Sequence, residues 1–229
     1  MTRLHEMGFW DFIQLMMLFL FFTSFFYRFV GLRIRQKVNP INWNFGENRF
    51  LGILELSLFL SVSIWAIEVM LYSIPLKTQI FPWPFNNLMI DSILAKWIGL
   101  FSSFLAFGLL FSGLKNLGDS WRFGIDEDQA GELVTRGIYG FTRNPIYMFF
   151  NLWFLGTFLI NGTLVFLCFA LFTIINLHCQ IIKEEEFLQK IHGSAFSEYC
   201  KKTPRYFSWE VLIKRWKVKP QISSEPLGK

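Results

Sequence analysis

Long apolar runs alternate with short polar segments along the chain. The apolar runs cover residues 12–30, 50–74, 90–114 and 146–182. Each is long enough to cross the hydrocarbon core of a bilayer as a helix, which takes roughly 20 residues. In the last run only Asn161-Gly162-Thr163 interrupts the apolar character, and this turn signature splits the run into two helices. The pattern predicts an all-α integral membrane protein with about five transmembrane helices, the last two of which form a hairpin.

The pattern changes after Lys183, where apolar residues recur at helical spacing instead of in one run. The residues that fall along one face are Phe187, Leu188, Ile191, Ala195, Phe196 and Tyr199. An apolar stripe at this spacing is typical of an amphipathic helix. We therefore expect a C-terminal amphipathic helix on the cytosolic side, lying against the membrane or the bundle.

Basic residues are distributed unevenly around the apolar runs. The cluster at the end of the first run consists of Arg28, Arg33, Arg35 and Lys37. The polar stretch over residues 115–143 is also rich in basic residues, whereas the loop over residues 78–88 carries almost no charge. Segments rich in lysine and arginine stay in the cytosol, so we expect the N-terminus outside and the C-terminus in the cytosol. We favour a bacterial inner membrane; an endoplasmic reticulum membrane would keep the same cytosolic chemistry.

The composition is typical of a membrane protein and limits the classes of partner that we expect. Hydrophobic residues make up 53% of the 229 residues and charged residues 17%, which is more apolar than a soluble domain of this length. The formal net charge of +5 comes from basic residues beside the apolar runs and suits an anionic membrane surface. The sequence has no basic stripe with interleaved aromatics and no cysteine spacing of the disulfide or zinc kinds. We therefore expect membrane lipids as partners, without nucleic acid or metal.

Three motifs lie at the cytosolic ends of the predicted helices. They are Leu133-Val134-Thr135-Arg136-Gly137-Ile138-Tyr139, Arg143-Asn144-Pro145-Ile146-Tyr147, and Glu184-Glu185 with Gly193 and Tyr199 downstream. Proline is favoured in the first helical turn, so the free amides after Pro145 would point to the cytosol and could hold a carboxylate. The acidic side chains at Glu184-Glu185 would attract a cationic ligand. Taken alone, the same residues also fit a capped helix start at the headgroups and a solvated charge run.

The second apolar run carries two acidic residues, Glu55 and Glu68. Ionisable groups at membrane depth are costly and are often functional or paired inside a bundle. At 3.6 residues per turn these two project from different faces of a helix, so they are not expected to form a catalytic pair.

The order of the cytosolic motifs resembles the isoprenylcysteine carboxyl methyltransferase family, in the branch of bacterial membrane methyltransferases that is related to phospholipid methyltransferases. The resemblance covers residues 117–207. It includes Leu117-Gly118 with Trp121-Arg122 and Gly124, which look like the family's lead-in to the cofactor site, and Pro204-Arg205 after the last helix. It divides the chain into an N-terminal three-helix membrane region (1–114), a methyltransferase module (115–207) and a polar tail (208–229).

The resemblance implies that S-adenosyl-L-methionine binds in a cytosolic pocket between the last membrane helices and the C-terminal helix. The positions that match the family's cofactor contacts are Glu132, Leu133, Val134, Tyr139, Asn144, Pro145, Ile146, Tyr147 and Glu184. Gln180 and Arg205 fall nearer the methyl acceptor and are the candidate catalytic residues, although an arginine at the membrane surface explains Arg205 equally well. The implied reaction is methyl transfer at the cytosolic membrane face to a lipid-like or small apolar acceptor through a carboxylate, amine or thiol.

Two positions depart from the family pattern, and two other functions stay open. Asn144 stands where the family often has histidine, and Gln180 stands where eukaryotic members have an arginine that is taken to hold the substrate carboxylate. A prenylcysteine carboxylate is therefore not favoured as the acceptor. The alternatives are an NADPH-dependent membrane reductase of the sterol-reductase type and a non-catalytic lipid-binding membrane protein. The short, half-acidic cytosolic loop favours S-adenosylmethionine, the smaller cofactor, over NADPH.

Overall fold

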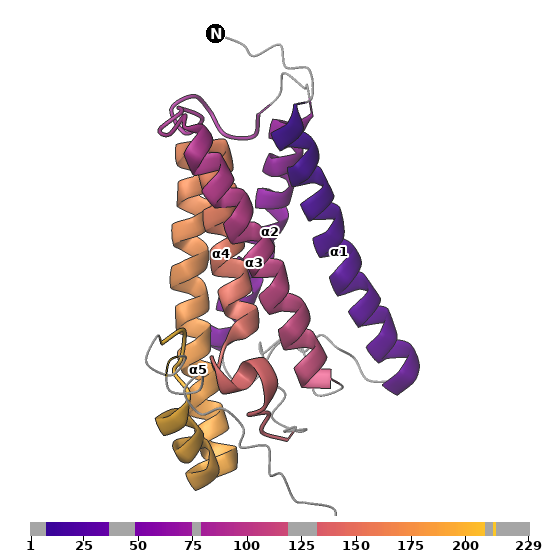
Figure 1. Ribbon diagram of the computed structural model, residues 1–229, viewed down its shortest axis with the longest axis vertical. Coiled ribbons are helices and arrows are strands. Elements are labelled where there is room, and N and C mark those ends of the chain that lie inside the picture. Colours follow the sequence, from indigo (N-terminus) through magenta and orange to yellow (C-terminus); the bar gives the residue numbers. More distant parts are fainter. Residues whose placement is uncertain (1–7, 37–48, 75–78, 119–131, 209–212, 214–229) are drawn as a thin grey trace, which may run out of the picture.

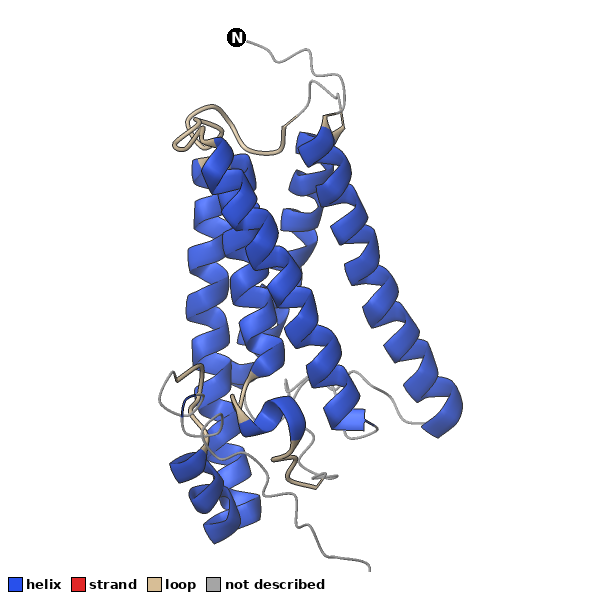
Figure 2. Cartoon of the chain, in the orientation of Figure 1, coloured by secondary structure: helices blue, strands red, loops and turns tan. Residues whose placement is uncertain are grey.

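The long elements of the structure are all helices. The computed structural model describes residues 8–36, 49–74, 79–118, 132–208 and 213. Its helices are α1 (Phe9–Gln36), α2 (Arg49–Ser73), α3 (Ile93–Leu117), the short 3-10 helix η2 (Gly137–Gly140), α4 (Pro145–Asn161) and α5 (Leu164–Lys202). The five long helices form one bundle in which neighbours along the chain run in opposite directions (Figures 1 and 2). The predicted all-α fold is confirmed.

Four of the long helices have the length and composition to cross a membrane. These are α1, α2, α3 and α5, whereas α4 has 17 residues. At a rise of about 1.5 Å per residue α4 is roughly 26 Å long, slightly less than a bilayer core of about 30 Å. Large apolar side chains point outward from the bundle; Phe19 is 74% exposed and Phe101 is 71% exposed. Lipid is the solvent that such a surface requires, so the chain is an integral membrane protein.

One end of the bundle gathers the segments that carry the motifs. α1 and α3 end there, α2 and α4 begin there, and η2 and the last part of α5 lie beside them (Figure 1). We call this the motif end, and the distribution of basic residues predicts that it faces the cytosol. Trp121-Arg122 and Gly124 of the lead-in motif, Lys37 and residues 209–229 apart from 213 lie outside the described residues.

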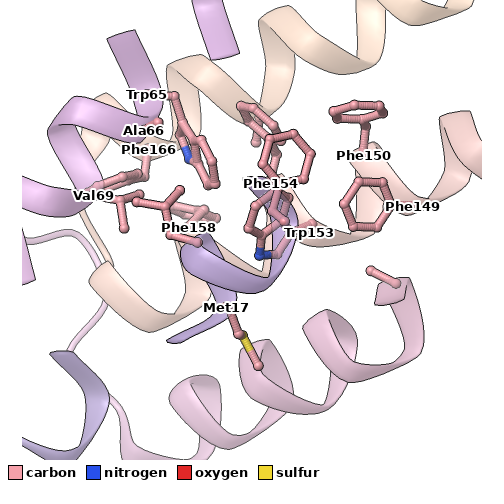
Figure 3. Packing of buried hydrophobic residues seen from close by; sticks show 14 of the residues in the cluster. Met17, Trp65, Ala66, Val69, Phe149, Phe150, Trp153, Phe154, Phe158 and Phe166 are labelled. Atoms are coloured by element: carbon pink, nitrogen blue, oxygen red, sulfur yellow. The ribbon is translucent and has the colours of Figure 1, made fainter. Parts of the chain in front are cut away.

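Aromatic rings fill the centre of the bundle (Figure 3). Trp65 of α2 stacks on Phe154 of α4 with ring centroids 4.5 Å apart, and Phe21 of α1 lies 4.6 Å from Trp153. Lipid tails are as apolar as these side chains, so close packing between rings, rather than escape from water, favours this arrangement. The core therefore centres on α4, which contacts rings from α1 and α2.

Small residues let α3 and α4 approach closely. A Cβ atom at Gly156 would lie 2.5 Å from the Ser103 hydroxyl oxygen and 2.7 Å from the Gly99 carbonyl oxygen. Across the same interface the Ser102 hydroxyl donates to the Leu152 carbonyl at 2.9 Å. Such small-residue contacts are typical of helix pairs in membranes. They fix α4, and with it the motif at its start, against α3.

A glycine turn joins α4 to α5. Gly162 adopts a left-handed backbone (φ 68°) and ends α4, where its N–H donates to the Phe158 carbonyl at 2.7 Å. Its own carbonyl accepts from the N–H groups of Met89 and Ile90 at 2.6 and 3.0 Å. A Cβ atom here would collide with the Ile90 carbonyl, so glycine is required on both counts. The hairpin predicted from Asn161-Gly162-Thr163 is confirmed.

α5 continues through Lys183 without a break. It leaves helical geometry only at Gly193 (φ 51°, ψ −121°). The prediction of a separate amphipathic helix that begins after Lys183 is therefore wrong in its start. Residues 183–192 are mostly good helix formers, so the helix propagates until a glycine permits a positive φ. The expected apolar face is also interrupted, because Phe196 is buried whereas Ile191 is 39% exposed.

Candidate functional site

η2 brings Tyr139 to the centre of the motif end. Asn116, at the end of α3, accepts a hydrogen bond from the Ile138 N–H through its side-chain oxygen at 2.8 Å. Gly137 has a left-handed backbone (φ 63°), and a Cβ atom there would collide with the Asn116 side chain. Tyr139 is buried as a result. Burial, with the negative charge of Glu184 nearby, raises the pKa of Tyr139 far above its ordinary value, so its phenol stays neutral.

The first turn of α4 opens into the same region. Asn144 precedes the helix and Pro145 is its first residue, as predicted. The alternative interpretation of Asn144 as a side-chain cap is wrong, because its Nδ2 instead donates to the Arg205 carbonyl at 3.0 Å. The first amides of a helix have no partner within it, so the N–H groups of Ile146 and Tyr147 are available to a bound anion.

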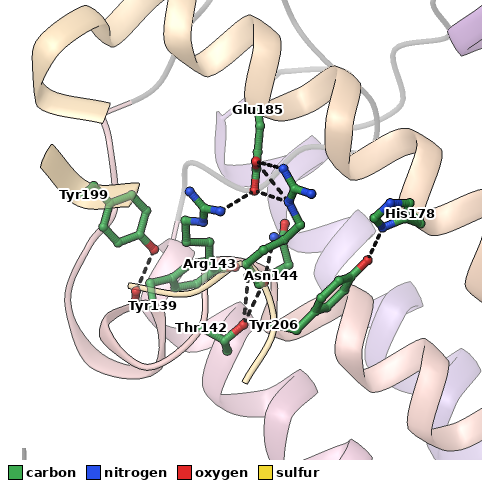
Figure 4. A network of polar contacts seen from close by, with 9 residues as sticks. Tyr139, Thr142, Arg143, Asn144, His178, Glu185, Tyr199 and Tyr206 are labelled. Atoms are coloured by element: carbon green, nitrogen blue, oxygen red, sulfur yellow. Dashed lines mark hydrogen bonds and ion pairs between the residues drawn. The ribbon is translucent and has the colours of Figure 1, made fainter. Parts of the chain in front are cut away.

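Residues 199–206 lie across the loop between η2 and α4, and we call them the C-terminal strap (Figure 4). The Tyr199 hydroxyl donates to the Tyr139 carbonyl at 2.6 Å. Further along, the Arg143 N–H donates to the Pro204 carbonyl at 3.0 Å. The strap therefore satisfies backbone groups of a loop that regular secondary structure leaves unpaired.

Arg205 joins the strap to the site through its main chain and its side chain. Its carbonyl accepts from Thr142 Oγ1 at 3.3 Å as well as from Asn144. Its guanidinium donates to Glu185, with Nη2 2.7 Å from Oε2 and Nε 3.2 Å from Oε1. Arg143 Nη2 approaches the same carboxylate at 3.2 Å. Hydrogen bonding to Glu185 raises the pKa of Arg205, which keeps its guanidinium charged.

The end of the strap rests against α5. The Tyr206 hydroxyl lies 2.7 Å from His178 Nδ1, and the two rings stack. Burial raises the pKa of Tyr206. His178 thus makes a packing contact that holds the strap in place (Figure 4).

A cavity of about 250 Å³ lies among these elements, and all five long helices contribute to its wall. Its size is near the lower end of small-molecule sites, which are roughly 300–1,000 Å³. The predicted cofactor residues all line it: Glu132, Leu133, Val134, Tyr139, Asn144, Pro145, Ile146, Tyr147 and Glu184. Gln180 lines it as well. Arg205 does not, so of the two candidate catalytic residues the structure brings only Gln180 to the cavity.

The cavity wall becomes apolar toward the middle of the bundle. Apolar lining residues contributed by α1, α2, α4 and α5 include Phe25, Leu51, Leu58, Phe150 and Leu177. At 3.6 residues per turn, Phe150 and Leu177 lie more than one turn deeper than Asn144 and Glu184. The cavity therefore joins a polar part at the motif end to an apolar part that reaches the N-terminal helices.

Sequence reasoning assigned none of the residues from α1 and α2 to the site. Phe25, Leu51 and Leu58 carried no signal that separates them from other apolar residues of a membrane helix. Glu55 did carry a sequence signal, because it is an ionisable group at membrane depth. In the structure it is 2% exposed and lines the cavity. Glu68 is also buried but is not among the lining residues, which confirms that the two acids do not share this site.

Glu184 has one carboxylate oxygen without a partner among the described residues. Its Oε2 atom is buried and accepts no hydrogen bond from them. The Tyr147 hydroxyl interacts with the same carboxylate. A buried carboxylate oxygen is costly unless it is paired, so a ligand group that donates a hydrogen bond or carries positive charge would be stabilised here.

Gln180 is held by contacts between α2 and α5. Its Nε2 donates to Asn176 Oδ1 at 2.6 Å and to the Leu54 carbonyl at 3.4 Å. Asn176 Nδ2 in turn donates to Ser57 Oγ at 2.7 Å. The amide nitrogen of Gln180 therefore serves helix packing, which leaves the side-chain oxygen as the group that can contact a ligand.

Comparison with known proteins agrees with the geometry. Residues 94–195 match the family model of phospholipid methyltransferases. This match covers less than half of the 229 residues. A protein-S-isoprenylcysteine O-methyltransferase of Schizosaccharomyces pombe is 38% identical over 73 residues, which are 31% of this chain and 31% of that protein. The similarity to this methyltransferase therefore covers less than a third of either chain.

The matched residues 94–195, which we call the matched module, extend from the start of α3 to just beyond Gly193. They contain every predicted cofactor residue and Gln180. α1, α2 and the residues of the strap from 199 onward lie outside the match. The module thus supplies most of the polar residues that line the cavity, and segments outside it add Glu55, the apolar residues of α1 and α2, and the strap.

Proposed function

We propose that the protein transfers a methyl group from S-adenosyl-L-methionine to a lipid-like acceptor at the cytosolic face of the membrane. The observation that carries the proposal is the Glu184 carboxylate oxygen that has no partner among the described residues, in a cavity that also contains the open first turn of α4. A site that offers both an anion-binding helix start and a buried acceptor suits a ligand with a carboxylate and positively charged groups. S-adenosylmethionine has both.

The residues around the cavity fit this cofactor. The N–H groups at the start of α4 would hold its carboxylate, with Arg143 adding positive charge nearby. Glu184 would accept from a donor or pair with a cationic group, and the faces of Tyr139 and Tyr147 favour positive charge. When bound, S-adenosylmethionine supplies a methyl group on a positively charged sulfur, which keeps the electron pair of the C–S bond when an electron-rich acceptor atom takes the methyl group. The protein's part is to position the two reactants.

The apolar part of the cavity supports an acceptor with a lipid tail. Phe25 and Leu58 bring the wall to helices whose other faces are exposed to lipid, so a tail can remain in an apolar environment while the head reaches the polar part. The names of the matched family and of the yeast relative both describe acceptors with a lipid portion. Glu55 and the Gln180 oxygen lie where the head of the acceptor would pass, and we propose that they contact it.

Calorimetric titration of the detergent-purified protein with S-adenosylhomocysteine tests the cofactor. We expect binding by the native chain and a loss of roughly 100-fold in affinity for Glu184→Gln, because the substitution removes a charge without changing shape. Glu186→Gln is the matched control: Glu186 is on the same helix but exposed, and pairs with Lys183. Its affinity should equal that of the native chain.

Two results would overturn the proposal. One is a native protein that binds no S-adenosylhomocysteine, and the other is binding that Glu184→Gln leaves unchanged. Competition by NADPH in the same titration would instead favour the membrane reductase. Once binding is established, transfer of a labelled methyl group to extracted membrane lipids, compared with transfer to water-soluble metabolites, tests the acceptor class.

A further inference from the structure

The Glu185–Arg205 contact joins residues that are 20 positions apart in the chain. A straight helix of that length would separate them by about 30 Å. They meet because the chain leaves helical geometry at Gly193 and returns along the motif end. The change of path thus carries Arg205 back to α5 and places the strap over the start of α4.

Glu185 lies between two guanidinium groups (Figure 4). The side chains of Glu185 and Arg143 are 14% and 12% exposed, whereas that of Arg205 is 37% exposed. Ion pairs with this degree of burial are screened less by salt than those on an open surface. Within the cluster of Arg143, Arg205 and Glu185, two positive charges oppose one negative charge.

We propose that Arg205 is a positioning residue for the cofactor site, and that its ion pair with Glu185 keeps the strap closed over the Thr142–Asn144 segment. This inference rests on the proposed function. Arg205 holds Glu185 through its side chain and Thr142 and Asn144 through its carbonyl. Closing the strap therefore fixes both the orientation of Arg143 and the residue that precedes the open amides of α4.

The ion pair between Arg205 and Glu185 affects cofactor affinity rather than the reaction rate. Arg205 does not line the cavity, so its loss removes no contact with bound reactants. An open strap instead lowers the fraction of molecules that are ready to bind, and the apparent dissociation constant rises in proportion. At saturating cofactor the site is closed again. KM for the cofactor should therefore increase while kcat stays close to that of the native chain.

The experiment compares Arg205→Ala, Arg205→Lys and Lys201→Ala in the full-length protein. Lys201 is the matched control, because it lies in the strap and also pairs with a carboxylate, that of Glu198, but is 71% exposed. We expect S-adenosylhomocysteine to bind roughly 10-fold more weakly to Arg205→Ala. Arg205→Lys, which keeps the charge but loses the two-point contact, should be intermediate, and Lys201→Ala should be unchanged. Methylguanidinium added to Arg205→Ala should restore part of the affinity.

The outcomes separate this inference from the proposed function. Absence of binding by the native chain would defeat the proposed function itself. Native binding with equal affinity for Arg205→Ala, or an equal fall in kcat and kcat/KM, would overturn the positioning role of Arg205 alone. Thermal unfolding of each variant shows whether it is folded. If Arg205→Ala does not fold, Arg205→Lys decides: native affinity in that variant would contradict the proposal, and weakened affinity with native kcat would support it.

Discussion

The matched module (residues 94–195) and the two N-terminal helices are held in different ways. In the module, Gly156 brings the backbone of α4 close to the Gly99 carbonyl and the small Ser103 side chain of α3. α1 instead makes ring contacts through Phe21 and a side-chain hydrogen bond in which Asn161 Nδ2 donates to Gln14 Oε1 at 2.6 Å. Much of α1 faces outward, and Tyr27 is 72% exposed. The closely packed module therefore carries the predicted cofactor residues, while α1 and α2, which contact it through side chains, supply part of the apolar wall.

This difference suggests a division of labour. Precise geometry is needed where a cofactor must be held for reaction, and the module has it. A wall that contacts an acceptor tail needs only apolar surface of suitable shape, and such surface can change without disturbing the module. We therefore expect substitutions in the module to affect folding and cofactor binding, and substitutions in α1 and α2 to affect the acceptor.

The strongest test of the closely packed module is Gly156→Ala. The added Cβ atom would lie 2.7 Å from the Gly99 backbone carbonyl oxygen, so α3 and α4 must separate. We expect a loss of about 3 kcal/mol in unfolding free energy, at the upper end of the usual range for overpacking. Unfolding of the native chain and the variant in mixed micelles measures this loss of free energy. Gly108→Ala is the control on α3, because nothing lies within 4 Å of its added Cβ. Equal stability of the two variants would show that the close approach is not needed.

The wall contributed by α1 is tested with Phe25→Ala, which removes a lining side chain outside the module. Loss of one aromatic contact with a lipid tail should lower kcat/KM for the acceptor roughly 10-fold, corresponding to about 1.5 kcal/mol. The affinity for S-adenosylhomocysteine should stay the same. Phe26→Ala removes the neighbouring ring, which is 69% exposed, and should change neither quantity. A fall in cofactor affinity with Phe25→Ala would refute the separation of the two roles.

The sequence predicted the helices well, for physical reasons. A bilayer allows only one way to satisfy the backbone of a long apolar run, so the runs over residues 50–74 and 90–114 correspond closely to α2 and α3. The turn at Asn161-Gly162-Thr163 could be predicted because few residue types other than glycine readily adopt a positive φ. The motif residues were found through their order along the chain, and the structure gathers them around one cavity.

The parts that could not be predicted depend on contacts between distant residues. The apolar side chains of Phe25 and Leu58 look like any lipid-facing residue, and their place in the wall follows from packing alone. The same holds for Arg205, which was expected near the acceptor and instead pairs with Glu185. Gly193 was recognised as part of a motif, but a single glycine does not reveal that the chain turns back at that point.

Asn176→Leu tests the link between the N-terminal helices and the module. Asn176 donates to Ser57 Oγ at 2.7 Å and to the Leu54 carbonyl at 3.2 Å, and so connects α5 to α2. Hydrogen bonds between membrane helices contribute about 0.6 kcal/mol each, so we expect a loss of roughly 1 kcal/mol in unfolding free energy. Ser63→Ala is the control, since its hydroxyl bonds within its own helix to Phe59. An unchanged stability for Asn176→Leu would mean that ring packing alone joins the two regions.

The smallest effect is expected for Tyr199→Phe, which removes the 2.6 Å hydrogen bond from the strap to the Tyr139 carbonyl and keeps the ring. A hydrogen bond of this kind contributes about 1 kcal/mol. Because other contacts also hold the strap, the affinity for S-adenosylhomocysteine should fall by only 2- to 5-fold, roughly the factor that up to 1 kcal/mol provides. Calorimetric titration of Tyr199→Phe and Arg205→Ala, run side by side, measures the affinity of each variant for S-adenosylhomocysteine. If Tyr199→Phe had the larger effect, the strap would be anchored at η2, and its rigidity would come from neutral hydrogen bonds near Tyr139 instead of the ion pair at Glu185.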